Sequence, residues 1–371
     1  RYVGYMDHQR AHGYYPSFLW KDGERLPLPG NTHADGGKTP EIYGPGATEK
    51  RRGNRDGKVT YAPDAMLAET LKFMEENRNR PMFILFSTNL PHGPVDIPPA
   101  ENKYAGHPAI RQAYAGAAGG NRECAGAAEE YASMVDKLDR QVGAILAQVH
   151  KLGLEKRTII VFSSDNGHEL YYRTDKERGR GLNCHGGVLD GTGELLDVFR
   201  GSRGLIGQKN AMVNLAGLKW TNHEGGIRVP LIVSWPGTVP HGKVCRSLVA
   251  NYDHMATFAE LAGVGMPEGK DSVSYKNMLF GKPSSQRDYV VVDHTVITGD
   301  GWKLTHKQDK WLLFQISSDP EERHNLAETR KDQLERLQAI YRKEAGSPRK
   351  DRQKPEQPRK TALFPPLAFA G

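Results

Sequence analysis

Apolar residues recur with a helical period in two long stretches of the chain. Leu67, Leu71 and Met74 follow one another at i, i+4 and i+7 after Pro63, which a first helical turn tolerates, and they predict a helix over residues 63–77. A longer stripe predicts a second helix over residues 127–151. Its members are Tyr131, Met134, Leu138, Val142, Ile145, Val149 and Leu152.

Short, continuous apolar runs predict strands that are covered on both faces. These runs are residues 82–87 (MFILFS), the start of residues 158–167 (TIIVFSSDNG) and residues 231–235. Helix and strand alternate here, which is expected of βα units and a largely parallel sheet. The pattern therefore predicts an α/β domain with helices flanking the sheet.

The organisation changes towards the C-terminus. Residues 253–262 predict a helix, and the composition shifts near residues 269–286. Beyond that, residues 289–293, 302–304 and 311–315 predict short strands and residues 332–344 an amphipathic helix, which together make a small α+β subdomain. We predict a main domain over residues 1–275, this subdomain over residues 276–346, and a basic, Pro-rich tail over residues 347–371 that is expected to be flexible.

The remaining stretches carry no sustained period. Residues 1–61 are interpreted as long loops, and residues 168–218 as a polar insertion that shapes substrate choice. The net charge of +7 suits polyanionic partners such as a sulfated polysaccharide. Nucleic acid is not favoured, because the basic residues are dispersed outside the tail and no motif of stacking aromatic residues accompanies them. No run reaches the roughly 18 apolar residues that a membrane helix needs.

Candidate chemistry lies where apolar runs end. Asp165-Asn166-Gly167 closes the run at residues 158–167, and ligands of open α/β sheets bind beyond the carboxyl ends of strands. A carboxylate and an amide suit a hard cation, although the same tripeptide is also ordinary turn chemistry. His92 follows residues 82–87 between Pro91 and Pro94, which restrict the backbone and suit a catalytic imidazole. A loop histidine without a role is the alternative.

Lys219 opens the stretch KWTNHEGGIRVP, in which two adjacent glycines imply a tight backbone. It is a candidate for the same crevice, with a solvated loop cation as the alternative. Glu224 and Arg228 are interpreted as a structural ion pair. The sequence contains no G-x-x-x-x-G-K-[ST], G-x-S-x-G or H-E-x-x-H motif, so the chemistries that these motifs carry are not favoured.

Taken together, these segments resemble the formylglycine-dependent type I sulfatases of the alkaline phosphatase superfamily, above all the bacterial polysaccharide and aryl sulfatases. The similar segments are NLPHGP, YASMVDKLDRQVGAIL, TIIVFSSDNG, LKWTNHEGGIRVPLIVSWPG, GDGWKLT and LFQISSDPEERHNLA. The resemblance extends over nearly all of residues 1–344. It implies an alkaline-phosphatase-like fold and the hydrolysis of sulfuric esters of carbohydrates or aryl alcohols.

The resemblance also implies roles for individual residues. Asp165 and Asn166 are expected to ligate one divalent cation, most often Ca²⁺ with Mg²⁺ as the alternative. His92 and Lys219 are expected to bind sulfate and act in catalysis, and His168 to bind substrate with them. A sulfate ester leaves poorly as an alkoxide, so His92 would protonate the bridging oxygen while Lys219 and the cation neutralise the other oxygens.

The sequence departs from the family in its nucleophile. Formylglycine is made from a C-x-P-x-R or S-x-P-x-R motif, and neither occurs in this sequence; the family's Asp-Asp metal pair and G-K-x-H segment are also absent. We expect all three in a segment preceding Arg1, and export to the periplasm or the cell exterior. Two alternatives stay open, namely phosphodiester or phosphonate hydrolysis on the same fold, and a non-catalytic anion-binding protein.

Overall fold

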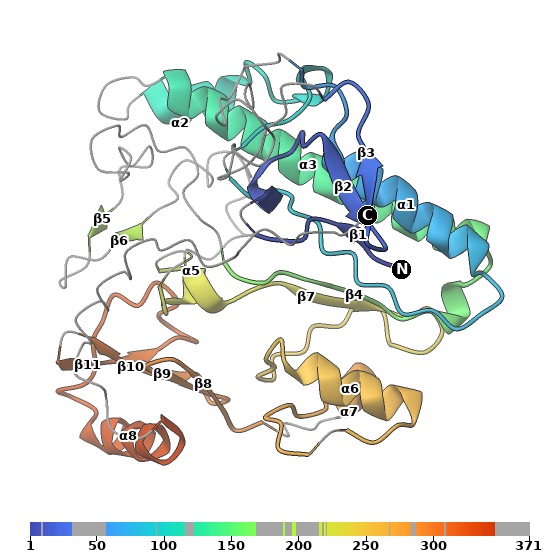
Figure 1. The fold of residues 1–371 in the computed structure, drawn as a ribbon. Coiled ribbons are helices and arrows are strands. Elements are labelled where there is room, and N and C mark those ends of the chain that lie inside the picture. Colours follow the sequence, from blue (N-terminus) through green and yellow to red (C-terminus); the bar gives the residue numbers. More distant parts are fainter. Residues whose placement is uncertain are drawn as a thin grey trace, which may run out of the picture. The chain divides into compact units, whose positions relative to one another are not determined.

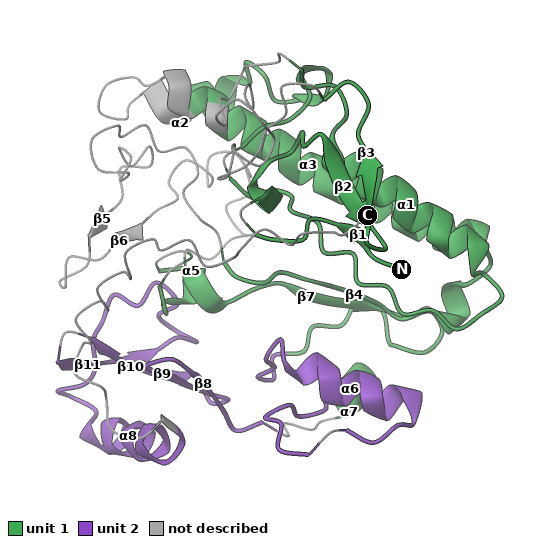
Figure 2. Ribbon diagram, in the orientation of Figure 1, with its two compact units in different colours: residues 1–245, 276–283 green, residues 246–275, 284–371 purple. Residues whose placement is uncertain are grey.

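Close contacts divide the chain into two units (Figure 2). Unit 1 comprises Arg1–Cys245 and Lys276–Pro283, and unit 2 comprises Arg246–Tyr275 and Ser284–Gly371. The predicted domain boundary after residue 275 stays a prediction, because the two units interleave around it. The computed structural model describes residues 1–8, 10–31, 57–93, 95–115, 122–167, 188–189, 195–197, 215–216, 219, 221–266, 268–282, 287–307 and 309–345. His168, most of the insertion and the basic tail therefore lie outside the described residues.

Two long helices of unit 1 confirm the helical periods. Helix α1 spans Ala62–Glu76 and helix α3 spans Arg122–Lys151, and they lie alongside each other (Figure 1). The stripes turn inward as expected, since Met74 of α1 and Val149 of α3 are buried in one cluster. Shorter helices are α2 (Pro108–Ala115) and α7 (Lys276–Leu279), with 3-10 turns η1 (Arg10–His12), η3 (Pro99–Glu101) and η4 (Glu155–Arg157).

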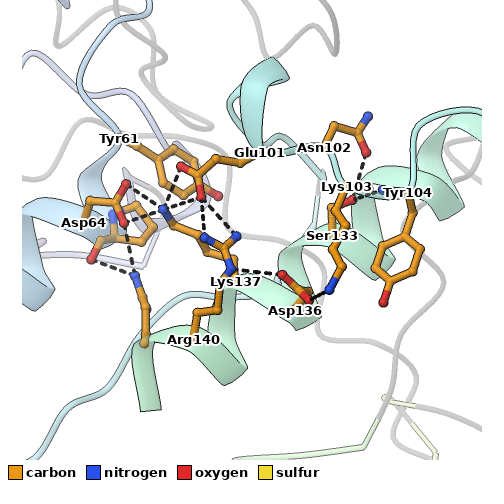
Figure 3. Close-up of polar contacts among 12 residues, drawn as sticks. Tyr61, Asp64, Glu101, Asn102, Lys103, Tyr104, Ser133, Asp136, Lys137 and Arg140 are labelled. Atoms are coloured by element: carbon orange, nitrogen blue, oxygen red, sulfur yellow. Dashed lines mark hydrogen bonds and ion pairs between the residues drawn. The ribbon is translucent and has the colours of Figure 1, made fainter. Parts of the chain in front are cut away.

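A charged cluster fixes α3 against α1 and η3 (Figure 3). The Nζ of Lys137, whose side chain is 8% exposed, lies 2.7 Å from Asp64 of α1 and 2.8 Å from Glu101 of η3. Arg140 also donates to Glu101 at 3.1 Å. Burial raises the pKa of Glu101, but hydrogen bonds from Lys137 and Arg140 outweigh burial and hold that pKa below its usual value. The cluster thereby anchors η3, which follows His92 along the chain, to α3.

The strands of unit 1 pair antiparallel wherever the structure describes a ladder. β4 (Ile160–Ser163) pairs with β7 (Leu231–Ser234), and both strands were predicted. An N-terminal sheet of β1 (Val3–Gly4), β2 (Phe18–Lys21) and β3 (Glu24–Pro27) forms where the sequence predicted only loops, so that prediction is wrong for these residues. β5 (Val188–Leu189) pairs with β6 (Leu195–Asp197) inside the insertion.

The prediction of a buried strand at residues 82–87 is wrong for the part of the chain that the structure describes. None of these residues lies in a helix or strand, and Phe83 and Leu85 are 76% and 80% exposed. Met82 packs against the cluster that Ile160 also contacts, and Phe86 packs against the cluster that includes Ala62 and Met66 of α1. A parallel neighbour, which the α/β pattern requires on such a run, is not among the described ladders.

Unit 2 is built on a four-stranded antiparallel sheet in the order β11-β10-β9-β8. Its strands are β8 (Tyr289–Val292), β9 (Thr295–Thr298), β10 (Trp302–Lys307) and β11 (Lys310–Gln315). Helix α8 (Lys331–Ala345) packs on this sheet through Leu337 and Tyr341. Helix α6 spans Asp253–Ala262 and ends at Gly263 with φ 68°, as the sequence predicts, whereas β9 was missed. None of the described helices is long and apolar enough to cross a membrane.

Candidate active site

The loop that carries His92 is tied to the N-terminal part of unit 1. The amide of His92 donates to Asn89 O at 2.8 Å and closes a turn. The hydroxyl of the buried Tyr14 donates to Asn89 O at 2.9 Å and to His92 O, while Asn89 Nδ2 donates to Ala11 O at 2.9 Å. These backbone contacts place the imidazole independently of its own side-chain contacts.

The ring nitrogens of His92 have distinct partners. Nδ1 lies 2.6 Å from Gly93 O, so Nδ1 carries the proton and donates it to that carbonyl. Nε2 is then the acceptor, and Nζ of Lys219 lies 3.2 Å from it. The structure thus brings together the two residues that the sequence proposed for anion binding.

The exit of β4 combines a turn with an exposed carboxylate. Asp165 Oδ1 accepts the amide of Asn166 at 2.9 Å, and Ser164 Oγ donates to Asn166 O at 3.0 Å. Asn166 Nδ2 donates to Gly167 O at 2.8 Å. The Asp-Asn-Gly sequence therefore does form the turn that its composition favours, and it leaves Asp165 exposed at the strand end.

One segment links this turn to His92. Gly167 N donates to Gly226 O at 2.9 Å in α5 (Glu224–Ile227), and Lys219 lies at the start of the same segment. A Cβ on Gly167 would lie 1.9 Å from Gly225 O, so only glycine fits there. Residues 219–226 thereby reach Nε2 of His92 at one end and the Asp165–Gly167 turn at the other.

The ion pair of Glu224 and Arg228 is confirmed. Glu224 Oε2 lies 3.6 Å from a guanidinium nitrogen of Arg228, and the side chains are 4% and 58% exposed. A buried carboxylate beside an exposed guanidinium is a structural arrangement rather than a site for substrate, because the carboxylate is sealed from solvent.

The donors at the strand end suit a hard cation in kind but not in number. Asp165 and Asn166 offer a carboxylate and an amide, whereas Ca²⁺ takes six to eight oxygens. Among the described residues no group of three or more His, Cys, Asp or Glu side chains is arranged to hold a metal ion. Further ligands would have to come from outside the described residues.

The sequence did not single out His12, which lies beside His92. The centroids of the two imidazole rings are 4.7 Å apart and the ring planes are at 90°. His12 belongs to RAHGYY, a stretch without hydrophobic period that was interpreted as loop. Its only signal was the density of histidine and tyrosine residues.

A family model described as Sulfatase matches residues 9–264, which include every described residue of the site. The chain belongs to the sulfatase family. A second model, described as N-sulphoglucosamine sulphohydrolase, C-terminal, matches residues 219–345. Sulfatases of this family generally use a divalent cation and formylglycine.

The names of curated relatives of this sulfatase refer to several classes of sulfate ester. N-acetylgalactosamine-6-O-sulfatase of Bacteroides thetaiotaomicron is 26% identical over 226 residues, covering 55% of this chain and 39% of that protein. Steryl-sulfatase of Rattus norvegicus is 27% identical over 191 residues, covering 50% of this chain and 28% of that protein. Arylsulfatase of Klebsiella aerogenes is 28% identical over 147 residues, covering 36% of this chain and 29% of that protein. The matched part of this sulfatase thus spans well under half the length of these relatives.

Solved structures confirm the fold. A structure in complex with its substrate D-glucosamine-2-N,6-O-disulfate has a TM-score of 0.59 at 18% identity, covering 92% of this chain and 75% of that chain. The crystal structure of Ps i-CgsB has a TM-score of 0.56 at 25% identity, covering 77% and 55%. The prediction of an alkaline-phosphatase-like α/β fold with a smaller C-terminal α+β subdomain is therefore confirmed. The ladders that the structure describes are antiparallel, however, where the sequence predicted a largely parallel sheet.

Proposed function

We propose that this sulfatase hydrolyses sulfuric esters of a carbohydrate or an aryl alcohol. The observation that carries the proposal is the 3.2 Å approach of Lys219 Nζ to His92 Nε2. An ammonium group and an imidazole nitrogen that meet at this distance form a small site for a tetrahedral anion, since Lys219 can donate to its oxygens and Nε2 of His92 can do so once it is protonated.

The two residues then divide the work. Lys219 neutralises charge on a sulfate oxygen. His92 takes up a proton from solvent on Nε2 and delivers it to the bridging oxygen as the bond to sulfur breaks. The hydrogen bond from Nδ1 to Gly93 O keeps Nε2 as the nitrogen that exchanges the proton. We propose His168 as a further contact to the substrate.

A cation and a nucleophile complete the proposal. Asp165 and Asn166 would hold a divalent cation, most often Ca²⁺, together with ligands from outside the described residues. That cation would supply neutralisation of sulfate charge, and formylglycine would supply the nucleophile. Neither group enters the roles assigned to His92 and Lys219.

A sulfated amino sugar is the substrate class that we propose first. One curated relative is named for N-acetylgalactosamine-6-O-sulfate chemistry, and one structural neighbour holds D-glucosamine-2-N,6-O-disulfate. The net charge of +7 favours a polyanionic substrate. Export to the periplasm or cell exterior belongs to the same proposal, since a polysaccharide is met there.

His92→Ala tests this function in the protein expressed from its complete gene. Loss of a general acid lowers turnover by roughly 10²- to 10⁴-fold, most for an alkyl sugar sulfate and least for nitrophenyl sulfate, whose leaving group needs no proton. His150→Ala, at the exposed end of α3, is the matched control and should keep wild-type rates. Equal slowing of both substrates would exclude proton delivery by His92, and a preference for a nitrophenyl phosphodiester would favour the phosphodiesterase alternative.

A further inference from the structure

The imidazole of His12 stands perpendicular to that of His92. The ring centroids are 4.7 Å apart, and His12 is the last residue of η1 (Arg10–His12). We propose that His12 is a positioning residue, which holds the ring of His92 in the orientation that presents Nε2 to the sulfate ester. This role rests on the proposed function, because it matters only if Nε2 delivers a proton.

His12 is itself held on both sides. Its Nδ1 contacts the carbonyl oxygen of His8, and the amide of Gly13 closes the turn onto Arg10 O at 2.9 Å. The ion pair of Arg10 and Asp7, at 3.0 Å, braces the residues that precede the turn. The imidazole of His12 that contacts His92 is therefore held in place by the contacts of this turn.

The same turn is joined to the loop of His92. Asn89, three residues before His92, donates from Nδ2 to the carbonyl oxygen of Ala11 at 2.9 Å. Ala11 is the residue directly before His12. The hydroxyl of Tyr14, two residues after His12, donates to His92 O. Because a side chain of each segment bonds to the backbone of the other, the two rings keep their separation even if one of the rings changes its other contacts.

The contacts that Nδ1 and Nε2 of His92 make are weak constraints on the orientation of its ring. The second torsion angle of histidine is broad, and the bond from Nδ1 to Gly93 O joins adjacent residues that move together. Lys219 has a long, flexible side chain and must turn to the sulfate when the ester binds. An edge-to-face ring contact restricts rotation of the His92 ring whether or not substrate is present. It favours the oriented ring over other orientations by about two- to twelvefold in population.

The test compares His12→Ala with His12→Phe in the protein expressed from its complete gene. His12→Ala should lower kcat for an alkyl sugar sulfate by about three- to tenfold, with KM within about twofold and nitrophenyl sulfate nearly unaffected. His12→Phe keeps a ring at this position and should recover most of the loss. In imidazole ¹⁵N spectra, the resonances of the Nδ1–H tautomer of His92 should be broadened by exchange in His12→Ala. They should be sharp again in His12→Phe.

Several outcomes would overturn this role. Wild-type kinetics for His12→Ala, while His92→Ala slows alkyl sulfates selectively, would reject His12 and leave the proposed function intact. A rise in KM without a change in kcat would make His12 a substrate contact instead. Failure of His12→Phe to recover activity, with its melting temperature unchanged, would also reject ring positioning. Equal slowing of both substrates by His92→Ala would instead reject proton delivery itself, and the role of His12 with it.

Discussion

Nζ of Lys219 lies 3.2 Å from Nε2 of His92, although 127 positions separate the two residues in the chain. The ammonium group can only donate, so Nε2 is the acceptor in this contact. Binding of a sulfate ester gives the ammonium group a better acceptor and leaves Nε2 to take up and deliver a proton.

Lys219→Ala should weaken binding and catalysis together. The lysine contacts sulfate oxygens in the ground state and the transition state alike, so KM should rise and kcat should fall, the latter on the order of 10²-fold. Steady-state kinetics with nitrophenyl sulfate measures both. Wild-type values of kcat and KM would remove Lys219 from the site.

Arg228→Ala is the matched change on the same segment, and it should cost stability rather than activity. It leaves the carboxylate of Glu224, which is 4% exposed, without the guanidinium at 3.6 Å. Because the guanidinium is 58% exposed, the expected loss is about 0.2–1 kcal/mol in the free energy of unfolding, measured by urea denaturation. A fully stable but inactive Arg228→Ala protein would show that Arg228 acts in the active site and not in stabilising the fold.

Gly167→Ala should disrupt the contact between the strand end and α5. A Cβ at this position would lie 1.9 Å from Gly225 O, which is backbone and cannot swing away. We expect a loss of about 1–3 kcal/mol in the free energy of unfolding. Gly143→Ala is the control, because a Cβ there meets nothing within 4 Å in the middle of α3, and it should stabilise by about 0.5–1 kcal/mol. Equal effects of the two changes would show that the close approach is not maintained in solution.

The cluster around Glu101 predicts how stability depends on acid. Burial opposes ionisation of Glu101, but the bonds from Lys137 and Arg140 prevail, so its pKa in the folded protein lies below the unfolded value of 4.5. The folded state therefore binds fewer protons, and the contribution is present above pH 4.5 and lost as pH falls through the folded-state pKa. Glu101→Gln should lower stability at neutral pH and flatten its decline below pH 4.5. Parallel pH curves for wild type and Glu101→Gln would contradict this origin.

Elements with a strong local period could be predicted from the sequence. The bounds of α6 at Asp253–Ala262 agree with prediction because a regular face ends at Gly263, where φ is 68°. The β2–β3 hairpin was missed although Asp22-Gly23, with φ of 52° and 96°, is a recognised signal for a two-residue hairpin turn. That signal was obscured by the polar composition around it.

Pairing between distant segments could not be predicted in the same way. Residues 82–87 have the apolar content of a buried strand, but burial depends on a neighbour that the run itself does not specify. The same holds for the site. His92 and Lys219 were each identified from local rigidity and resemblance, whereas their contact depends on the approach of Gly167 to α5 and on the bonds from Tyr14. His12 had no pattern of its own and became visible only through the ring that it faces.

Residues 1–371, expressed alone, should bind calcium weakly and hydrolyse no sulfate ester. The described part of the strand end offers Asp165 and Asn166, two of the six to eight oxygens that calcium takes, and the sequence holds no motif for formylglycine. We also expect aggregation or binding of a hydrophobic dye, because Phe83, Leu85 and Ile232 are 76%, 80% and 61% exposed. Calorimetry with calcium, a nitrophenyl sulfate assay and dye fluorescence measure these properties. Asp165→Asn is the matched control, since it keeps the oxygen at Oδ1 that accepts the amide of Asn166 but removes the charge. Micromolar calcium affinity that Asp165→Asn abolishes, together with steady turnover, would mean that ligands and a nucleophile within these residues complete the site.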